Sequence, residues 1–177
     1  MLNLFEQEKD GKNRVANVII LQVPTSKYDA SNPGGGGLGG NKQDGYQIVG
    51  GYASDGWAAS QELLGNGGDE SCFLFNLTQN LRFTAVKGRG PYQVTDTQSD
   101  EKRKRRILFG HLNSMALVIE NDFSSVSSRI GHLQDPNTRF VFGDELMQKN
   151  KVNSIIPGTI EFEKPHAVEV WSFNLKQ

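Results

Sequence analysis

About nine short apolar runs, separated by turns rich in Gly, Pro, Asn and Asp, constrain the fold of this chain more than any other feature. Many of their side chains are β-branched or aromatic and alternate with polar ones, which is typical of β-strands. Parallel strands need helical crossovers, and strongly amphipathic helical stretches are scarce, so the sequence favours antiparallel pairing. We predict a mainly β (α+β) fold, a sandwich of two antiparallel sheets with a few short helices. The runs lie at residues 15–23, 46–53, 71–77, 80–86, 107–110, 115–120, 139–142, 159–162 and 167–175.

Residues 50–77 combine large hydrophobic residues with turn residues more densely than the rest of the chain. Their strongest strand pattern is S-C-F-L-F-N-L, whose side chains alternate between two faces. One face holds Cys72, Leu74 and Asn76, and the other holds Phe73, Phe75 and Leu77. We expect the face with the two Phe residues to point into the core. The glycines at 50–51 predict a β-bulge or a close backbone approach.

The connecting segments divide into turns, short helices and two long loops. We predict a turn at residues 65–69, short helices at residues 58–64 and 144–151, and a Ser-rich stretch at 124–133 without a firm helical pattern. The loop at residues 25–44 contains G-G-G-G-L-G-G, which lacks the Lys-Ser/Thr ending of a phosphate-binding loop. We interpret it as a flexible surface loop.

The length of 177 residues fits one domain, because domains usually hold about 100–200 residues. We expect an N-terminal arm at residues 1–14 and a single domain at residues 15–177, with flexible loops at 25–44 and 96–106. The chain has no signal-peptide pattern and no apolar run of about 18 residues. Its one Cys cannot form an internal disulfide, which favours a reducing compartment. We therefore expect an intracellular, soluble protein of the cytoplasm, without membrane insertion.

The 19 basic and 20 acidic residues nearly cancel, so no overall charge points to nucleic acid or to an anionic membrane. The one charge-dense segment, residues 96–106, ends in the basic run K-R-K-R-R at 102–106. This run is a candidate nucleic-acid patch, but it lacks interleaved aromatic residues and follows acidic ones. A solvated loop is the favoured interpretation, and we expect no nucleic-acid partner.

Cys72 is the candidate for redox chemistry, since an exposed thiol of lowered pKa reacts with peroxide. Its neighbours in sequence include Glu70, whose negative charge would raise the thiol pKa, so a buried, inert Cys is the favoured interpretation. Glu70 and Glu169 form the candidate pair for acid–base catalysis. The sequence does not bring the two carboxylates together, and we favour structural hydrogen bonds to loop amides.

The remaining candidates are three histidines and two tryptophans. His111, His132 and His166 are scattered and lack the spacing of a metal site, so the sequence predicts no metal ligands. Trp57 and Trp171 are interpreted as packing residues of the core and the sheet edge rather than as a ligand platform. No residue is assigned to catalysis, to a cofactor or to a metal.

Several motifs occur together in a fixed order. They are G-G-Y-A-S-D-G-W at 50–57, G-N-G-G-D-E-S-C-F-L-F-N-L at 65–77, I-L-F-G-H-L-N-S-M-A-L-V-I-E-N-D-F at 107–123, S-S-R-I-G-H-L at 127–133, and G-T-I-E-F at 158–162 with A-V-E-V-W-S-F at 167–173. In this order and spacing they resemble the TLDc domain of the oxidation-resistance proteins. The resemblance runs from about Val15 to the end of the chain. The segment before Val15 lacks the family's opening motif, and residues 34–40 and 102–106 resemble loop insertions.

The resemblance implies a sandwich of two antiparallel sheets and a non-enzymatic role. TLDc proteins are linked to oxidative-stress protection and to regulation of the vacuolar-type proton ATPase. We therefore hypothesise a non-catalytic interaction module, a scaffold or regulator in a larger assembly, with protein partners such as subunits of that ATPase. An exposed sheet edge or the N-terminal arm is expected to be completed by another protein. The alternative hypothesis is a thiol-dependent antioxidant enzyme that uses Cys72.

Overall fold

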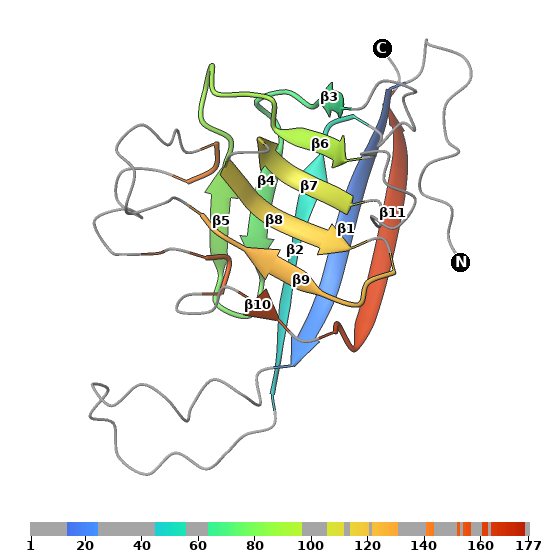
Figure 1. The fold of residues 1–177 in the computed structure, drawn as a ribbon, viewed down its shortest axis with the longest axis vertical. Helices are drawn as coiled ribbons and strands as arrows, with labels where there is room; N and C mark the ends of the chain where they lie inside the picture. Colours follow the sequence, from blue (N-terminus) through green and yellow to red (C-terminus); the bar gives the residue numbers. More distant parts are fainter. Residues whose placement is uncertain are drawn as a thin grey trace.

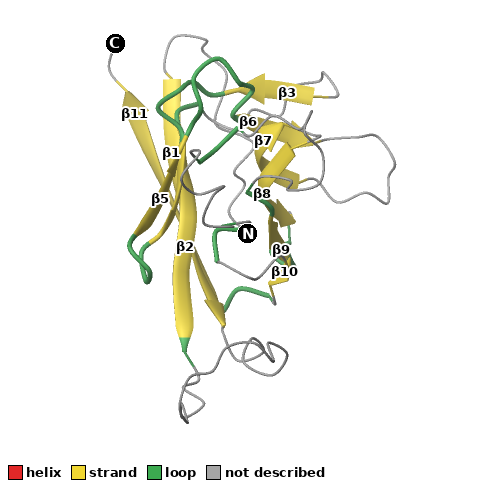
Figure 2. Cartoon of the chain, turned by 90° about the vertical axis from the view of Figure 1, so that its left-hand side faces the viewer, coloured by secondary structure: helices red, strands yellow, loops and turns green. Residues whose placement is uncertain are grey.

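The chain folds into two antiparallel sheets packed face to face (Figures 1 and 2). The predicted β-sandwich is therefore confirmed. The computed structural model describes residues 14–24, 45–55, 64–96, 106–111, 114–120, 122–130, 141–143, 152, 154–156, 161–162 and 164–175. Within these ranges there is no helix, and none therefore that is long and apolar enough to cross a membrane. The helix predicted at residues 144–151 lies outside them.

One sheet has five strands in the order β11-β1-β2-β4-β5. β1 is its longest strand, because V-A-N-V-I-I-L-Q-V is a nearly continuous apolar run rich in β-branched residues. The first strand pairs with the last along its length, with Ile19 opposite Val170, so the sheet joins residues from both ends of the described chain. The strands are β1 (Arg14–Pro24), β2 (Tyr46–Ala53), β4 (Phe73–Asn76), β5 (Leu81–Thr84) and β11 (Ala167–Leu175).

The second sheet has six strands in the order β10-β9-β8-β7-β6-β3. β7 and β8 form its most apolar pair, with a register shift between Phe109 and Gly110. The strands are β3 (Leu64–Gly67), β6 (Gln93–Asp96), β7 (Arg106–His111), β8 (Ser114–Glu120), β9 (Val126–Ser128) and β10 (Glu161–Phe162).

Three strands of the second sheet were not predicted. Residues 64–67, assigned to a helix end and a turn, form β3, and the Ser-rich stretch contains β9. β6 carries no apolar alternation of its own. Each is short and has at least one partner distant in sequence, β3 pairing with β6 and β9 with β10, although β6 and β9 also pair with the adjacent strands β7 and β8. Their pairing therefore comes from the sheet rather than from local propensity, which tertiary context overrides in β structure.

The side chains of β4 point in the opposite sense to the prediction. Leu74 is fully buried between the sheets, and Cys72 and Asn76 share its face. Phe73 lies on the outer face, partly exposed, stacked with Tyr52 at a ring-centroid distance of 5.3 Å. The expectation that the Phe face points into the core is thus wrong. Both faces are apolar, so the alternation alone did not distinguish them.

The predicted close backbone approach at the glycine pair is confirmed. A Cβ at Gly51 would lie 2.6 Å from Phe109 Cζ, so the ring of the opposite sheet packs directly on this backbone. On the other face, a Cβ at Gly50 would lie 2.7 Å from Phe75 Cζ. The two sheets approach at Gly51 because this residue has no side chain, whereas Gly50 leaves room for the Phe75 ring on the outer face.

Candidate functional site

Cys72 lies in a polar cluster between the sheets, where β2, β4 and β6 come together. Cys72 is 1% exposed, and its Sγ lies 3.3 Å from Ser54 Oγ. The Ser54 backbone N–H donates to the same sulfur at 3.4 Å, and the thiol donates to Gln93 Oε1 at 3.8 Å. Gln93, also buried, donates through Nε2 to the Asp55 carbonyl at 2.6 Å. All the polar groups around the sulfur are therefore hydrogen-bonded, as buried polar groups must be.

The loop after β3 is fixed by the same cluster. The Gly68 N–H donates to Asp55 Oδ2 at 3.0 Å, and the Asp69 N–H donates to Ser54 Oγ at 2.8 Å. Gly68 has φ +82°, and a Cβ there would lie 2.8 Å from Cys72 Sγ. Glycine is therefore required at this position for both its conformation and its size. The cluster therefore fixes the loop between β3 and β4 against the end of β2.

The surroundings of Cys72 disfavour a reactive thiolate. Burial raises the pKa of the thiol from its ordinary value of 9.0, and hydrogen bonds from Ser54 oppose the increase, while the charge of Asp69 adds to it. Reactive cysteines need some exposure and a lowered pKa. The expected burial of Cys72 is therefore confirmed, and its inertness stays a prediction.

An open cavity of about 660 Å³ adjoins this loop. Side chains that line it make hydrogen bonds to nearby loop groups of the chain. Glu70 Oε1 accepts from the Gly88 N–H at 3.2 Å, and Asp69 Oδ1 accepts from the N–H and hydroxyl of Ser71. The Tyr92 hydroxyl donates to the Val86 carbonyl at 2.9 Å. The cavity is lined by Asp69, Glu70, Ser71, Gly88, Gly90 and Tyr92.

The two candidate carboxylates do not meet. Glu70 precedes β4, and its bond to Gly88 is the loop-amide contact expected from the sequence. Glu169 lies on β11 and accepts from Trp171 Nε1 at 3.2 Å instead of from a loop amide. β11 and β4 are three strand spacings apart, about 14 Å. An acid–base pair of these two groups is therefore excluded by the topology.

The histidines and tryptophans do not converge on a site. His166 is exposed, and its ring lies 5.1 Å from that of Tyr46. His111 ends β7 and pairs with Ser114, whereas His132 and Trp57 lie outside the described residues. In the part of the chain that the structure describes, no group of three or more His, Cys, Asp or Glu side chains is suited to hold a metal ion. Trp171 is on the edge strand β11, as predicted, but it is 56% exposed and is therefore not the packing residue that was expected.

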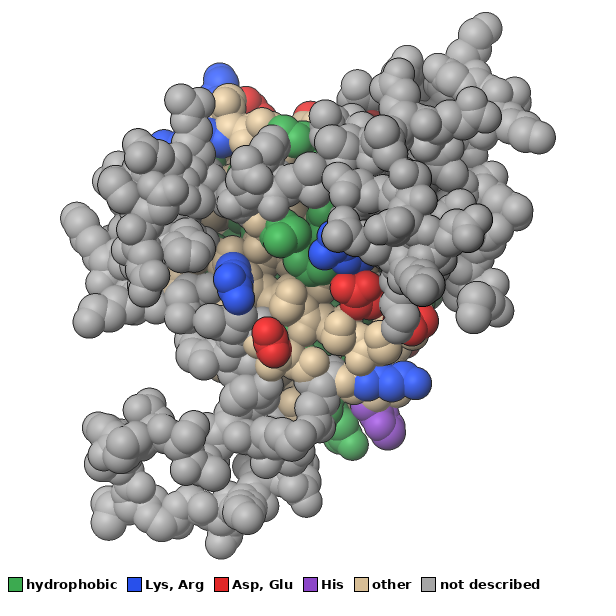
Figure 3. Space-filling view, in the orientation of Figure 1, with side chains coloured by type: hydrophobic (Ala, Val, Ile, Leu, Met, Phe, Trp, Pro, Cys, Tyr) green, Lys and Arg blue, Asp and Glu red, His purple; other side chains and the backbone are tan. Residues whose placement is uncertain are grey.

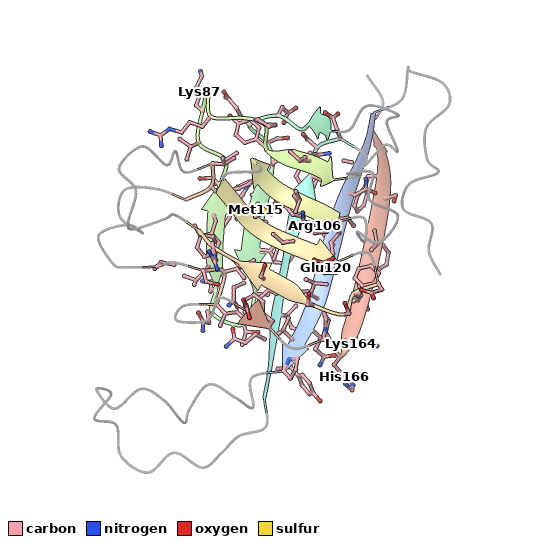
Figure 4. The ribbon with its side chains drawn as sticks, viewed as in Figure 1. Lys87, Arg106, Met115, Glu120, Lys164 and His166 are labelled. Atoms are coloured by element: carbon pink, nitrogen blue, oxygen red, sulfur yellow. The ribbon has the colours of Figure 1, made fainter. Side chains whose placement is uncertain are left out.

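The outer face of the six-stranded sheet carries a small apolar cluster and a charged pair. Figure 3 shows hydrophobic side chains surrounded by charged ones on this face, and Figure 4 locates Met115 in it. The cluster consists of Val94, Leu108, Val118 and Met115. Arg106, the last residue of the predicted basic run, begins β7 opposite Glu120 in the ladder. The rest of that run, residues 102–105, is outside the described part of the chain.

The outer face of the five-stranded sheet points away from the second sheet, which packs on its other side (Figure 2), and it carries exposed aromatic side chains. Trp171 is 56% exposed and Phe173 is 47% exposed. The strand register places four side chains of this face in one row across β11, β1, β2 and β4: Trp171, Val18, Tyr52 and Phe73. We call this surface the aromatic face. It comprises the exposed or partly exposed Val18, Ile20, Tyr52, Phe73, Trp171 and Phe173, together with Phe75, which is 8% exposed.

Sequence reasoning missed both the partners of Cys72 and the aromatic face. Ser54 and Asp55 directly follow the strand pattern of β2, and polar residues at a strand end are a sequence signal that could have predicted the cluster. Gln93 had no local signal, because its role depends on β6 lying opposite β3. The aromatic face required the orientation of β4, which the alternation left open.

The family comparison follows the motifs. The family model of the TLDc domain matches residues 2–174, which is nearly the whole chain. The match includes the segment before Val15, in which the family's opening motif was not apparent. No curated protein matches the chain. The matched length, together with the two-sheet sandwich, shows that this chain belongs to the TLDc domain family.

Proposed function

We propose that this chain is a non-catalytic TLDc-type protein-interaction module that acts as a scaffold or regulator in a larger assembly. The aromatic face is the observation that carries the proposal. Soluble proteins rarely leave a contiguous apolar surface of this kind uncovered, and such surfaces mark interaction sites. Trp and Tyr are also the residues that contribute most to binding at protein interfaces.

The polar cluster around Cys72 supports the non-catalytic part of the proposal. Its sulfur is buried and fully hydrogen-bonded, and the neighbouring carboxylates of Asp69 and Glu70 bond to loop groups. A catalytic group must instead reach the substrate with a pKa suited to proton transfer or attack. The contacts of the cluster fix the loop before β4, so a structural role explains these residues and no catalytic role is needed.

The specific assembly is proposed from family membership. The vacuolar-type proton ATPase is the first candidate partner, and protection against oxidative stress is the associated role. The protein is proposed to act inside the cell as a soluble component of that complex, through protein contacts and without nucleic acid.

Binding to the purified vacuolar-type ATPase tests this function. The wild-type chain is titrated against the enzyme by biolayer interferometry, and the same titration is repeated with Trp171→Ser/Phe173→Ser. We expect saturable binding that the double variant weakens at least about tenfold, since aromatic residues that dominate binding at an interface are worth about 2 kcal/mol or more. Leu77→Ser is the matched control, because Leu77 is 61% exposed but lies in the turn after β4.

Two outcomes would contradict the proposal as stated. Equal binding by the wild type and the double variant would remove the aromatic face from the interaction. Absence of binding to the ATPase, with every variant folded by circular dichroism, would exclude that assembly.

A further inference from the structure

Two side chains of opposite charge, Glu169 and Arg82, flank the aromatic face at the two ends of one cross-strand row. Glu169 on β11 is opposite Ile20 on β1, which is opposite Gly50 on β2. Gly50 is opposite Phe75 on β4, which is opposite Arg82 on β5. Glu169 and Arg82 therefore end one row on the two edge strands, about 19 Å apart across four strand spacings.

This arrangement is self-complementary. A two-fold axis in the plane of the interface and parallel to β2, the middle strand, exchanges the two edges of the sheet. It places Glu169 of one copy against Arg82 of the other, twice. We propose that the aromatic face binds a second copy of this chain in this orientation, forming a symmetric face-to-face dimer. The inference rests on the proposed function in taking the aromatic face as a protein-binding surface.

The apolar rows between the charges also match under this rotation. β1 and β4 lie on opposite sides of β2, so the axis sets the aliphatic side chains of β1 against the Phe side chains of β4. Val18 faces Phe73 of the other copy, Ile20 faces Phe75, and Tyr52 lies near its own symmetry mate. Alternation of aliphatic and aromatic groups across an interface allows the side chains to interdigitate.

Each charge is held by an aromatic neighbour on its own strand or the next. The Arg82 guanidinium carbon lies 4.1 Å from the Phe73 ring centroid, and Glu169 Oε2 accepts the Trp171 indole N–H at 3.2 Å. A guanidinium that stacks on a ring keeps its N–H groups available for a carboxylate. The geometry therefore reduces the side-chain entropy that an intermolecular ion pair would lose.

The other in-plane axis, perpendicular to the strands, is disfavoured by the same charges. It leaves each strand facing its own copy, so Glu169 would meet Glu169 and Arg82 would meet Arg82. Like charges at an interface are unfavourable and exclude wrong arrangements. The orientation parallel to β2 is the one that the charges select.

Sedimentation velocity of the purified chain over a range of concentrations tests the proposal. We expect a reversible monomer–dimer equilibrium for the wild type. Glu169→Arg alone and Arg82→Glu alone each set like charges against each other at both contacts, and each should weaken the dimer at least about tenfold. An equimolar mixture of the two variants restores both ion pairs, so it should form a heterodimer as tight as the wild-type dimer.

The matched controls reverse charges on the other sheet. Glu161→Arg on β10 and Arg129→Glu after β9 alter exposed residues away from the aromatic face and should leave the dimer unchanged. Circular dichroism confirms that each variant is folded. A wild type that stays monomeric at the highest concentration of the range would overturn the proposal. A dimer that neither charge reversal weakens would also overturn it. If the wild type is monomeric but still binds the ATPase through Trp171, the dimer proposal is wrong. The proposed function would not be affected by that result.

Discussion

Gly51 of β2 and Phe109 of β7 are in contact across the two sheets, and a Cβ at Gly51 would lie 2.6 Å from Phe109 Cζ. The same Cβ would lie 2.8 Å from Leu74 Cδ2. Gly51→Ala therefore forces two fully buried side chains to move. We expect a loss of about 1–3 kcal/mol in the free energy of unfolding, measured by urea denaturation, because overpacking a core costs that much.

Gly67→Ala is the control for that substitution. The nearest atom to a Cβ at Gly67 is Gln93 Nε2 at 3.4 Å, an ordinary contact distance. Its effect should stay within about 0.5 kcal/mol, as for substitutions that create no clash. Equal losses for the two variants would mean that the sheets do not approach each other at Gly51.

Asn76 connects β4 to residues 154–156 through a fully satisfied buried amide. Its Nδ2 donates to Gln47 Oε1 at 2.8 Å and to the Ile155 carbonyl at 3.0 Å, and its Oδ1 accepts from the Gln79 N–H at 3.0 Å. Asn76→Leu leaves these partners without a bond, and we expect a loss of about 2–4 kcal/mol in urea denaturation. Gln79→Leu, an exposed position, should change stability by less than about 0.5 kcal/mol. A neutral Asn76→Leu would contradict this role.

Cys72 predicts a loss of stability at high pH. Burial raises the thiol pKa in the folded state above 9.0, whereas the unfolded thiol titrates near that ordinary value. The folded state therefore keeps a proton that the unfolded state releases, and stability is lost as pH rises past 9.0. Between pH 8 and pH 10 the wild type should lose stability relative to Cys72→Ala, by at most about 1.4 kcal/mol per pH unit. Parallel curves for the two proteins in urea denaturation would show that the thiol pKa is not raised.

The same burial predicts low reactivity toward electrophiles and peroxide. We expect iodoacetamide to modify Cys72 in the native protein at least about tenfold more slowly than in the urea-unfolded chain at the same pH. Peroxide consumption by the wild type and by Cys72→Ser should be equal. Faster consumption by the wild type would instead support the thiol-dependent alternative.

The fold class and several strands were predictable because they depend on local pattern. The bounds predicted for β2 and β11 agree with those observed. The candidate site was less accessible. Cys72 was predicted to be buried, but its partner Ser54 directly follows β2 and its partner Gln93 lies in β6, and only the pairing of the second sheet brings them together.

The sequence by itself determined that β4 alternates between two faces, because the side-chain period of a strand is two residues. The tertiary structure decided which face is buried. Leu74 points inward because Gly51 and Phe109 leave room for it between the sheets, and Phe73 and Phe75 cover the outside of β2. Burial depends on what the rest of the chain packs against a strand, which no local period encodes. The aromatic face, and the interactions proposed for it, follow from that tertiary choice.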